Sequence, residues 1–122
     1  MVAWQAGETA SGYAVWTAAD GPEARVSGCL SSGLASARPR LAVGVPGEYW
    51  MILSGATGSP RTVLLFNFHQ GEWDSPQTLG EGSTAEVFTN QDDEWQAAWC
   101  GTNQEVNYLA AGVPVAVNAP VV

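Results

Sequence analysis

Residues 48–68, EYWMILSGATGSPRTVLLFNF, decide the fold of this chain. Two apolar runs, 48–54 and 61–68, are separated by a segment of Gly, Ala, Thr, Ser and Pro that is typical of a turn. Each run is apolar at successive positions, which is the pattern of a strand buried on both of its faces. The runs are also short and are rich in aliphatic and aromatic residues, which favours strand over helix. This stretch therefore predicts two central strands.

Short apolar runs bounded by Gly and Pro continue on both sides of this stretch. Before it, they predict strands at 13–18, 24–30 and 40–45, with a loop at 31–39 (SSGLASARP). After it, they predict strands at 84–89, 95–100, 105–109 and 113–118. No stretch of about 11 residues has a 3.6-residue period, and no repeat is present. We therefore expect one all-β domain over residues 1–122, an antiparallel β-sandwich or barrel of about eight or nine short strands.

The charged residues are few and mostly acidic. Only 13% of the 122 residues are charged, against about 25% in an ordinary domain, while 46% are hydrophobic. The chain has 12 acidic residues but only four Arg and no Lys, which gives a net charge of −8. Proteins bind nucleic acids and anionic membranes through clustered Lys and Arg side chains. This chain has only four Arg and no Lys, so we expect neither as a partner. No segment reaches the roughly 18 apolar residues of a membrane span, and MVAWQAGETAS lacks the features of a signal peptide.

The sequence contains no motif of a known catalytic or cofactor site. HExxH, CxxC and GxSxG are missing, and GVPGEYW lacks the Lys of a phosphate loop. We therefore expect no catalytic residues, no cofactor, no metal and no enzymatic activity. His69, Glu72 and Asp74 form either a polar hairpin tip or a set of ligands for a divalent ion. The acidic run NQDDE at 90–94 is either a solvated hairpin loop or a calcium site.

The two cysteines leave two alternatives open. Cys29 and Cys100 could form one disulfide, which would stabilise the fold by closing a long loop. They could equally be two buried free thiols, since free Cys is among the most buried residue types.

The six tryptophans are the most informative residues for function. Trp95 and Trp99 fall on one face of a predicted strand, where they are either core, a platform for sugars, or anchors at a protein interface. Trp4 and Trp73 have polar flanks and are expected to be exposed. The candidate partner or ligand contacts are therefore Trp4, Trp73, Trp95 and Trp99. A surface with so few charges loses little on desolvation, which favours a structural or interaction protein.

Two segments resemble the small β-rich head-decoration (cement) proteins of tailed bacteriophages. AGETASGYAVWTAADGPEARVSG at 6–28 is similar to their opening, with its Gly-Glu, its Gly before a short strand and its Asp-Gly turn. GVPGEYWMILSG at 44–55 is similar to the strand that follows in them. The resemblance implies a homo-oligomer, a trimer or similar cluster, that sits on a capsid lattice of the virion and stabilises it without catalysis.

Two other functions remain open from the sequence. A secreted carbohydrate-binding module would use Trp73, Trp95 and Trp99 as platforms, with Asn and Asp side chains as hydrogen-bond partners for the glycan. LLFNFHQGEWDSPQTLGEGSTAEVFT at 64–89 resembles strand pairs of the membrane-active aegerolysins and actinoporins. Those proteins need an exposed aromatic or basic patch, and this chain has little basic charge.

Overall fold

The computed structural model describes residues 1–5, 10–15, 26–31, 39–54, 62–102, 104–110 and 113–115. Every regular element in these ranges is a β-strand, and every strand pair is antiparallel, which confirms the all-β expectation. In chain order the strands are β1 (Val2–Gln5), β2 (Ala10–Val15), β3 (Val26–Ser31), β4 (Arg40–Val43), β5 (Tyr49–Ser54), β6 (Thr62–His69), β7 (Glu72–Trp73), β8 (Gln77–Thr89), β9 (Trp95–Gly101), β10 (Val106–Ala110) and β11 (Val113–Val115).

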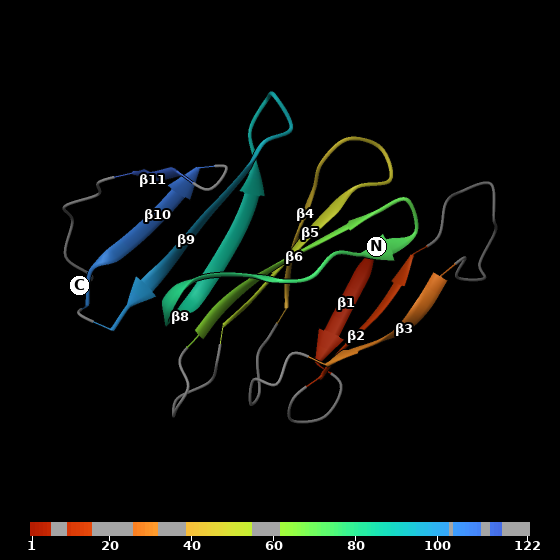
Figure 1. Ribbon diagram of the computed structural model, residues 1–122, viewed down its shortest axis with the longest axis horizontal. Helices are drawn as coiled ribbons and strands as arrows, with labels where there is room; N and C mark the ends of the chain where they lie inside the picture. The colour runs from red at the N-terminus through yellow and green to blue at the C-terminus, as the bar shows by residue number, and fades with distance from the viewer. Residues whose placement is uncertain are drawn as a thin grey trace.

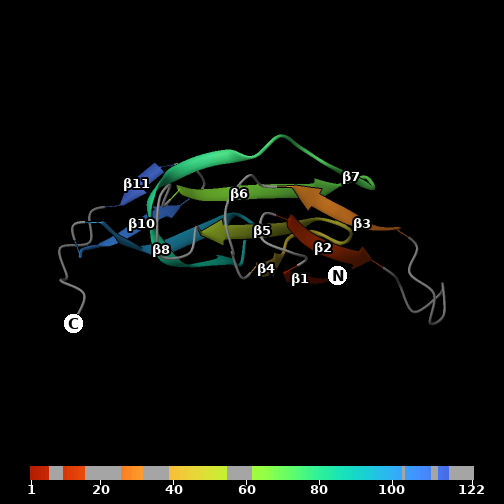
Figure 2. The same ribbon diagram turned by 90° about the horizontal axis from the view of Figure 1, so that it is seen from below.

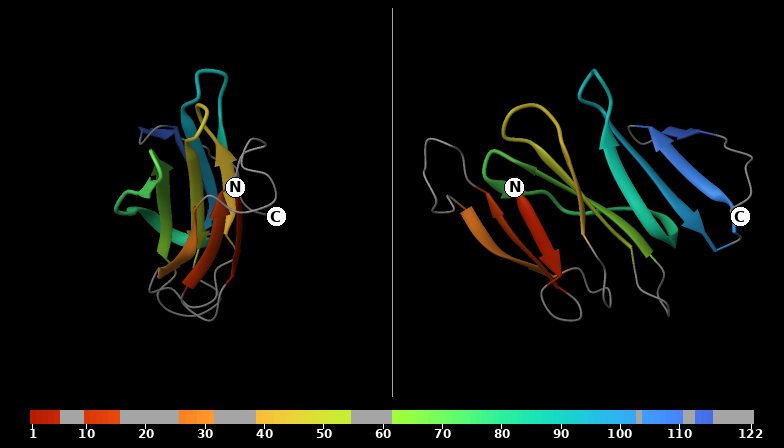
Figure 3. Two further views of the ribbon diagram at one scale, coloured as in Figure 1. Left: turned by 90° about the vertical axis from the view of Figure 1, so that its right-hand side faces the viewer. Right: turned by 180° about the vertical axis from the view of Figure 1, so that it is seen from behind.

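The strands form two sheets that are arranged in three layers. One sheet has the order β1-β2-β3, and the other has the order β11-β10-β9-β8-β6-β5-β4, with β7 added beside β6. Figure 1 shows the β1–β3 sheet, the β4–β6 strands and the β8–β11 strands as three neighbouring groups. The same succession is visible from behind in Figure 3. The β4–β6 strands are therefore the middle layer.

The middle layer is buried on both of its faces, as the sequence predicts. Met51 and Leu53 of β5 join Leu64 and Phe66 of β6 in a cluster against which Ala3 of β1 packs. The alternate residues of both strands face the other way, into a second cluster with β8 and β9. Its buried members are Ile52, Val63, Leu65, Ala85, Val87, Trp95, Ala97 and Trp99. Because side chains alternate along a strand, one pair of apolar strands fills both cores.

The long strand β8 connects the middle layer to the outer one. Its first part pairs with β6, and from Gly82 onward it pairs with β9 (Figure 2). The change of partner coincides with Gly82 at φ +155° and Thr84 at φ 53°, where the register also shifts. A bulge of this kind bends a strand and increases its twist. Beyond the bend, the Thr89 hydroxyl donates to the Val43 carbonyl of β4 at 2.7 Å, which ties the two layers together.

The predicted strands all have counterparts, but several ends differ and two strands are additional. β1 and β7 were not predicted, because runs of four and two residues carry too short an alternation. β8 begins at Gln77 instead of 84, since Gly80 and Gly82 resemble a turn in the sequence. β4 ends at Val43, and a turn closes where the Glu48 amide donates to the Val45 carbonyl at 2.8 Å. Positions 16–18, 24, 25, 32–38, 55–61 and 116–118 of the predictions lie outside the described residues.

Candidate interaction surface

Two of the four candidate tryptophans are in the core. Trp95 and Trp99 are each only 6% exposed and lie on the inner face of β9. The Trp99 indole N–H donates to the Glu81 carbonyl at 3.2 Å, and its ring lies against Gly80, where a Cβ would come within 2.8 Å of it. The prediction that these two side chains contact a partner or a ligand is therefore wrong. Their strand alternates between buried and half-buried positions, and they occupy the buried ones.

Trp73 is half-buried in an aromatic cluster that joins two layers. Its ring meets Phe68 of β6 at 5.1 Å and Tyr13 of β2 at 5.2 Å between centroids, both edge to face. Phe66 approaches it in the same way at 6.1 Å. Such edge-to-face pairs add to the stabilisation that burial gives. Trp73 therefore holds the β1–β3 sheet against the middle layer and offers only part of its ring to solvent.

Trp4 is the candidate that the structure places at the surface. It lies on the outer face of β1 and is 46% exposed, as is its neighbour on that face, Val2. The indole lies over Gly12, the residue directly opposite on β2, so that a Cβ at position 12 would overlap the ring. Gly12 therefore provides the flat seat that the indole needs. The Gly is visible in the sequence, but the pairing that puts it under Trp4 is not.

The sheet that carries Trp4 has no charged side chain. The described residues of β1, β2 and β3, VAWQ, ASGYAV and VSGCLS, contain no Asp, Glu, Arg, Lys or His. The charged side chains of the described residues lie on the other strands and their hairpins. The described strands therefore contribute no charged side chain to the outer face of this sheet, although the net charge of the protein is −8.

Three further apolar side chains are exposed away from this sheet. Val43 and Val45 lie at the β4–β5 turn with 58% and 47% exposure, and Phe88 lies on β8 with 41%. Phe88 packs on the Tyr108 ring, whose hydroxyl lies 2.6 Å from the Gln96 amide oxygen. Glu86, on the same face of β8, pairs with Arg40 at 3.3 Å. This second surface is therefore more polar than the face of the β1–β3 sheet.

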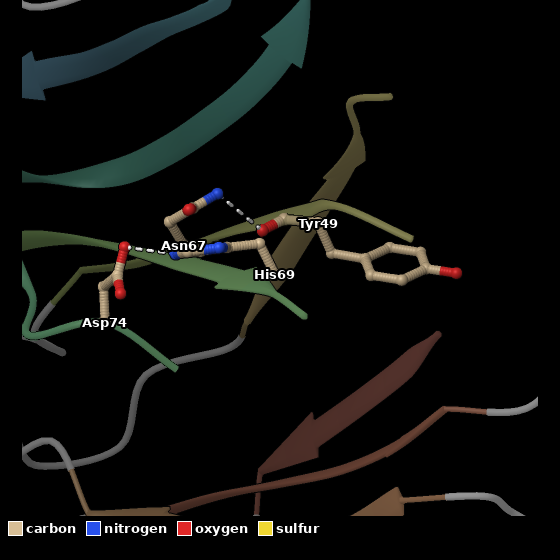
Figure 4. A network of polar contacts seen from close by, with 4 residues as sticks. All are labelled: Tyr49, Asn67, His69 and Asp74. Atoms are coloured by element: carbon tan, nitrogen blue, oxygen red, sulfur yellow. Dashed lines mark hydrogen bonds and ion pairs between the residues drawn. The ribbon is translucent and has the colours of Figure 1, made fainter. Parts of the chain in front are cut away.

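The polar groups around His69 form a hairpin tip. His69 Nε2 lies 2.8 Å from Asp74 Oδ2, and Asn67 donates from Nδ2 to the Tyr49 carbonyl at 3.4 Å (Figure 4). The turn between β6 and β7 has positive φ at both Gln70 and Gly71, which suits a two-residue hairpin. Within the ranges that the structure describes, no three His, Cys, Asp or Glu side chains gather in a way that could hold a metal ion.

The acidic run at 90–94 is also organised as a hairpin loop. The Asn90 side-chain oxygen accepts the amides of Asp92 and Glu94 at 2.9 and 3.0 Å. The Asn90 amide donates to the Glu94 carbonyl at 2.9 Å and closes the turn between β8 and β9. The Asn90 oxygen, which a calcium site would use, is therefore occupied by the turn itself.

The cysteines are two free thiols and not a disulfide. Cys29 is exposed on β3, and Cys100 is half-buried on β9, in a different layer. The alternative of free thiols is thus the one present, although Cys29 is exposed and not buried.

The described part of the chain contains no helix with the length and apolar character needed to span a membrane. The sequence matches no protein-family model and no curated protein, and the fold matches no solved structure.

Proposed function

We propose that this protein is a non-enzymatic structural component that assembles through neutral, tryptophan-containing surfaces, and that it decorates the capsid of a virion. The observation that carries the proposal is the uncharged β1–β3 sheet with Trp4 exposed on its outer face. The resemblance of 6–28 and 44–55 to phage head-decoration proteins supports the choice of a capsid as the assembly.

A surface strand without charged side chains suits a protein interface, and the described strands of this sheet have none. A molecule of net charge −8 is repelled by acidic neighbours, and a contact is least unfavourable where no carboxylate must be desolvated. Interface cores are depleted in charged residues and enriched in aromatic ones, with Trp prominent among the residues that contribute most to binding. Trp4, seated over Gly12, fits that description.

The carbohydrate-binding alternative has less support. It requires Trp73, Trp95 and Trp99 as platforms, and two of these are 6% exposed while the third packs among other rings. We therefore expect tryptophan emission to stay unchanged when the protein is titrated with a broad panel of polysaccharides. Quenching or a blue shift of the tryptophan emission with one glycan would make carbohydrate binding the better-supported function.

Binding to capsid shells tests the proposed function. The purified protein is mixed with expanded, empty shells of tailed phages and sedimented, and shell stability is followed by heating. We expect co-sedimentation with at least one shell and a higher temperature of shell disruption. Trp4→Ser should weaken binding by about tenfold or more, the effect of removing one interface anchor. Phe88→Ser, which removes an aromatic ring of similar exposure on β8, is the matched control and should bind normally. Absence of binding to every shell would contradict the proposal.

A further inference from the structure

The β4–β5 turn and the β8–β9 hairpin loop lie beside each other at one end of the molecule. The Thr89 hydroxyl, at the end of β8, donates to the Val43 carbonyl, at the end of β4, at 2.7 Å. Three residues earlier on each strand, Arg40 pairs with Glu86 at 3.3 Å. The last part of β8 therefore runs beside β4 in the same direction, and both strands lead into their loops at the upper end of Figure 1.

Exposed apolar side chains gather where these two loops begin. Val43 of β4 and Phe88 of β8 are both exposed. Their neighbours in sequence, Ala42 and Val87, face the core that β8 and β9 share with the middle layer. Because side chains alternate along a strand, Val43 and Phe88 point away from that core. Val45, in the turn after β4, is exposed as well, so three of the five exposed large apolar side chains of the described residues lie at this end.

The Phe88 ring and the β8–β9 loop are both held in place. Phe88 packs on the Tyr108 ring at 6.1 Å between centroids, and the Tyr108 hydroxyl lies 2.6 Å from the Gln96 amide oxygen. In the loop, the Asn90 side-chain oxygen accepts the amides of Asp92 and Glu94. A surface that is already ordered loses little conformational freedom when a partner binds, which favours affinity.

Carboxylates lie on both loops beside these apolar side chains. Asp92, Asp93 and Glu94 are exposed in the β8–β9 loop, and Glu48 is half-buried in the β4–β5 turn. In the described part of the chain, neither of the two ion pairs involves any of these four carboxylates. The apolar and acidic residues together form what we call the hairpin-end surface: Val43, Val45, Glu48, Phe88, Asp92, Asp93 and Glu94.

We propose that the hairpin-end surface binds a cationic segment of another protein, in which an apolar side chain lies between Lys or Arg residues. The apolar side chain would cover Phe88 and Val43, and the cations would lie against the loop carboxylates. Opposite charges across an interface select the partner, while a central apolar contact contributes much of the affinity. This inference goes beyond the proposed capsid contact, because it uses none of the residues around Trp4.

The charge of the surface is what selects this occupant. Four carboxylates repel anionic lipids and nucleic acids, which are themselves negatively charged. A second copy that met the surface with its own hairpin-end surface would bring the same four carboxylates to the contact. A partner segment with Lys or Arg is attracted instead, and it neutralises carboxylates that have no cation beside them within the described residues.

Binding of a designed peptide tests the two requirements, charge and apolar contact. The probe is a short fluorescein-labelled peptide of Gly-Lys-Leu repeats, followed by fluorescence anisotropy with the full chain. We expect saturable binding that weakens several-fold between about 50 mM and about 500 mM NaCl, because salt screens exposed charges. Peptides of Gly-Glu-Leu or Gly-Lys-Ser repeats should bind about tenfold more weakly or not at all. Equal binding of either control peptide, or no binding of the Gly-Lys-Leu peptide, would overturn the inference.

Removal of charge at two places tests the location. Asp92→Asn with Asp93→Asn removes two carboxylates from the surface, and Asn tolerates the positive φ of position 93. Glu72→Gln with Glu81→Gln removes two exposed carboxylates elsewhere and gives the same net charge, so it is the matched control. The first pair should weaken binding of the Gly-Lys-Leu peptide about fivefold or more, and the second less than about twofold. Equal weakening would show attraction by net charge alone and would overturn the inference.

Aromatic variants separate this surface from the capsid contact. Phe88→Ser should weaken binding of the Gly-Lys-Leu peptide about tenfold, as expected for loss of a central anchor, while Trp4→Ser should leave it unchanged. Equal effects of the two variants on the peptide would overturn the inference. A protein that binds capsid shells but not the peptide retains the proposed function and loses the hairpin-end surface. A protein that binds the peptide but no shell retains this surface and loses the capsid as the assembly.

Discussion

At the residue scale, aromatic rings cover glycines in both sheets. Trp4 lies over Gly12, the Tyr13 hydroxyl would be 3.2 Å from a Cβ on Gly28, and Trp99 covers Gly80 of β8. In each case the space that a side chain would take is filled by a ring from a neighbouring strand. The glycines therefore serve packing here, whereas the sequence alone presents them as turn residues.

The strictest of these positions is Gly82. Its φ is +155°, and a Cβ there would overlap the Cys100 carbonyl oxygen, a backbone atom that cannot move aside. Gly82→Ala should therefore lower the free energy of unfolding by about 3 kcal/mol. Gly47→Ala is the matched control, because Gly47 also has positive φ but has no atom near a Cβ, and it should cost about 1 kcal/mol. Urea unfolding of both variants measures the difference, and equal losses would contradict this explanation.

Single residues also show how far the sequence could predict the site. The alternation of 95–99 placed Trp95 and Trp99 on one face, but the sequence does not say which face of that strand is covered. That information comes from β5 and β6, which are distant in sequence and pack on the indole side. Trp4 was identified by its polar flanks, whereas Val2 was missed because only the pairing of β1 with β2 shows that the two share an outer face.

At the element scale, β8 is the strand that the sequence described least well. Only its last six residues were predicted, because the glycines before them resemble a turn. The structure uses those glycines to bend one continuous strand from one layer into the next. Periodicity detects straight, half-buried strands, and a strand that changes partner in mid-course breaks the period on which that detection depends.

The bend of β8 also contains a strained residue. Thr84 has φ 53°, a conformation that β-branched residues rarely adopt and that Asn tolerates, and its side chain is exposed. Thr84→Asn should therefore raise the free energy of unfolding by about 0.5–1 kcal/mol. Thr78→Asn, at another exposed position of β8 whose φ is not positive, should be neutral or slightly destabilising. Thermal unfolding compares the pair, and a lower melting temperature for Thr84→Asn would contradict the assignment of strain.

At the scale of the whole molecule, the all-β class and the doubly buried centre were predictable, and the third layer was not. The runs at 48–54 and 61–68 required cover on both faces, which the structure provides. Which strands provide it depends on pairing between segments far apart in the chain. Short runs such as β1 carry too little pattern to show in the sequence which layer they join.

The double burial of β5 and β6 has a consequence for how the chain survives in solution. YWMILS and TVLLFNFH are short, uncharged apart from the terminal His69, free of Pro and rich in strand-forming residues, the combination that promotes amyloid-like self-assembly. In the folded protein both strands have hydrogen-bonded neighbours on their two sides and packed layers above and below. The hazard is therefore confined to chains that have not finished folding, and aggregation during synthesis should follow the rate at which the outer layers close over this pair.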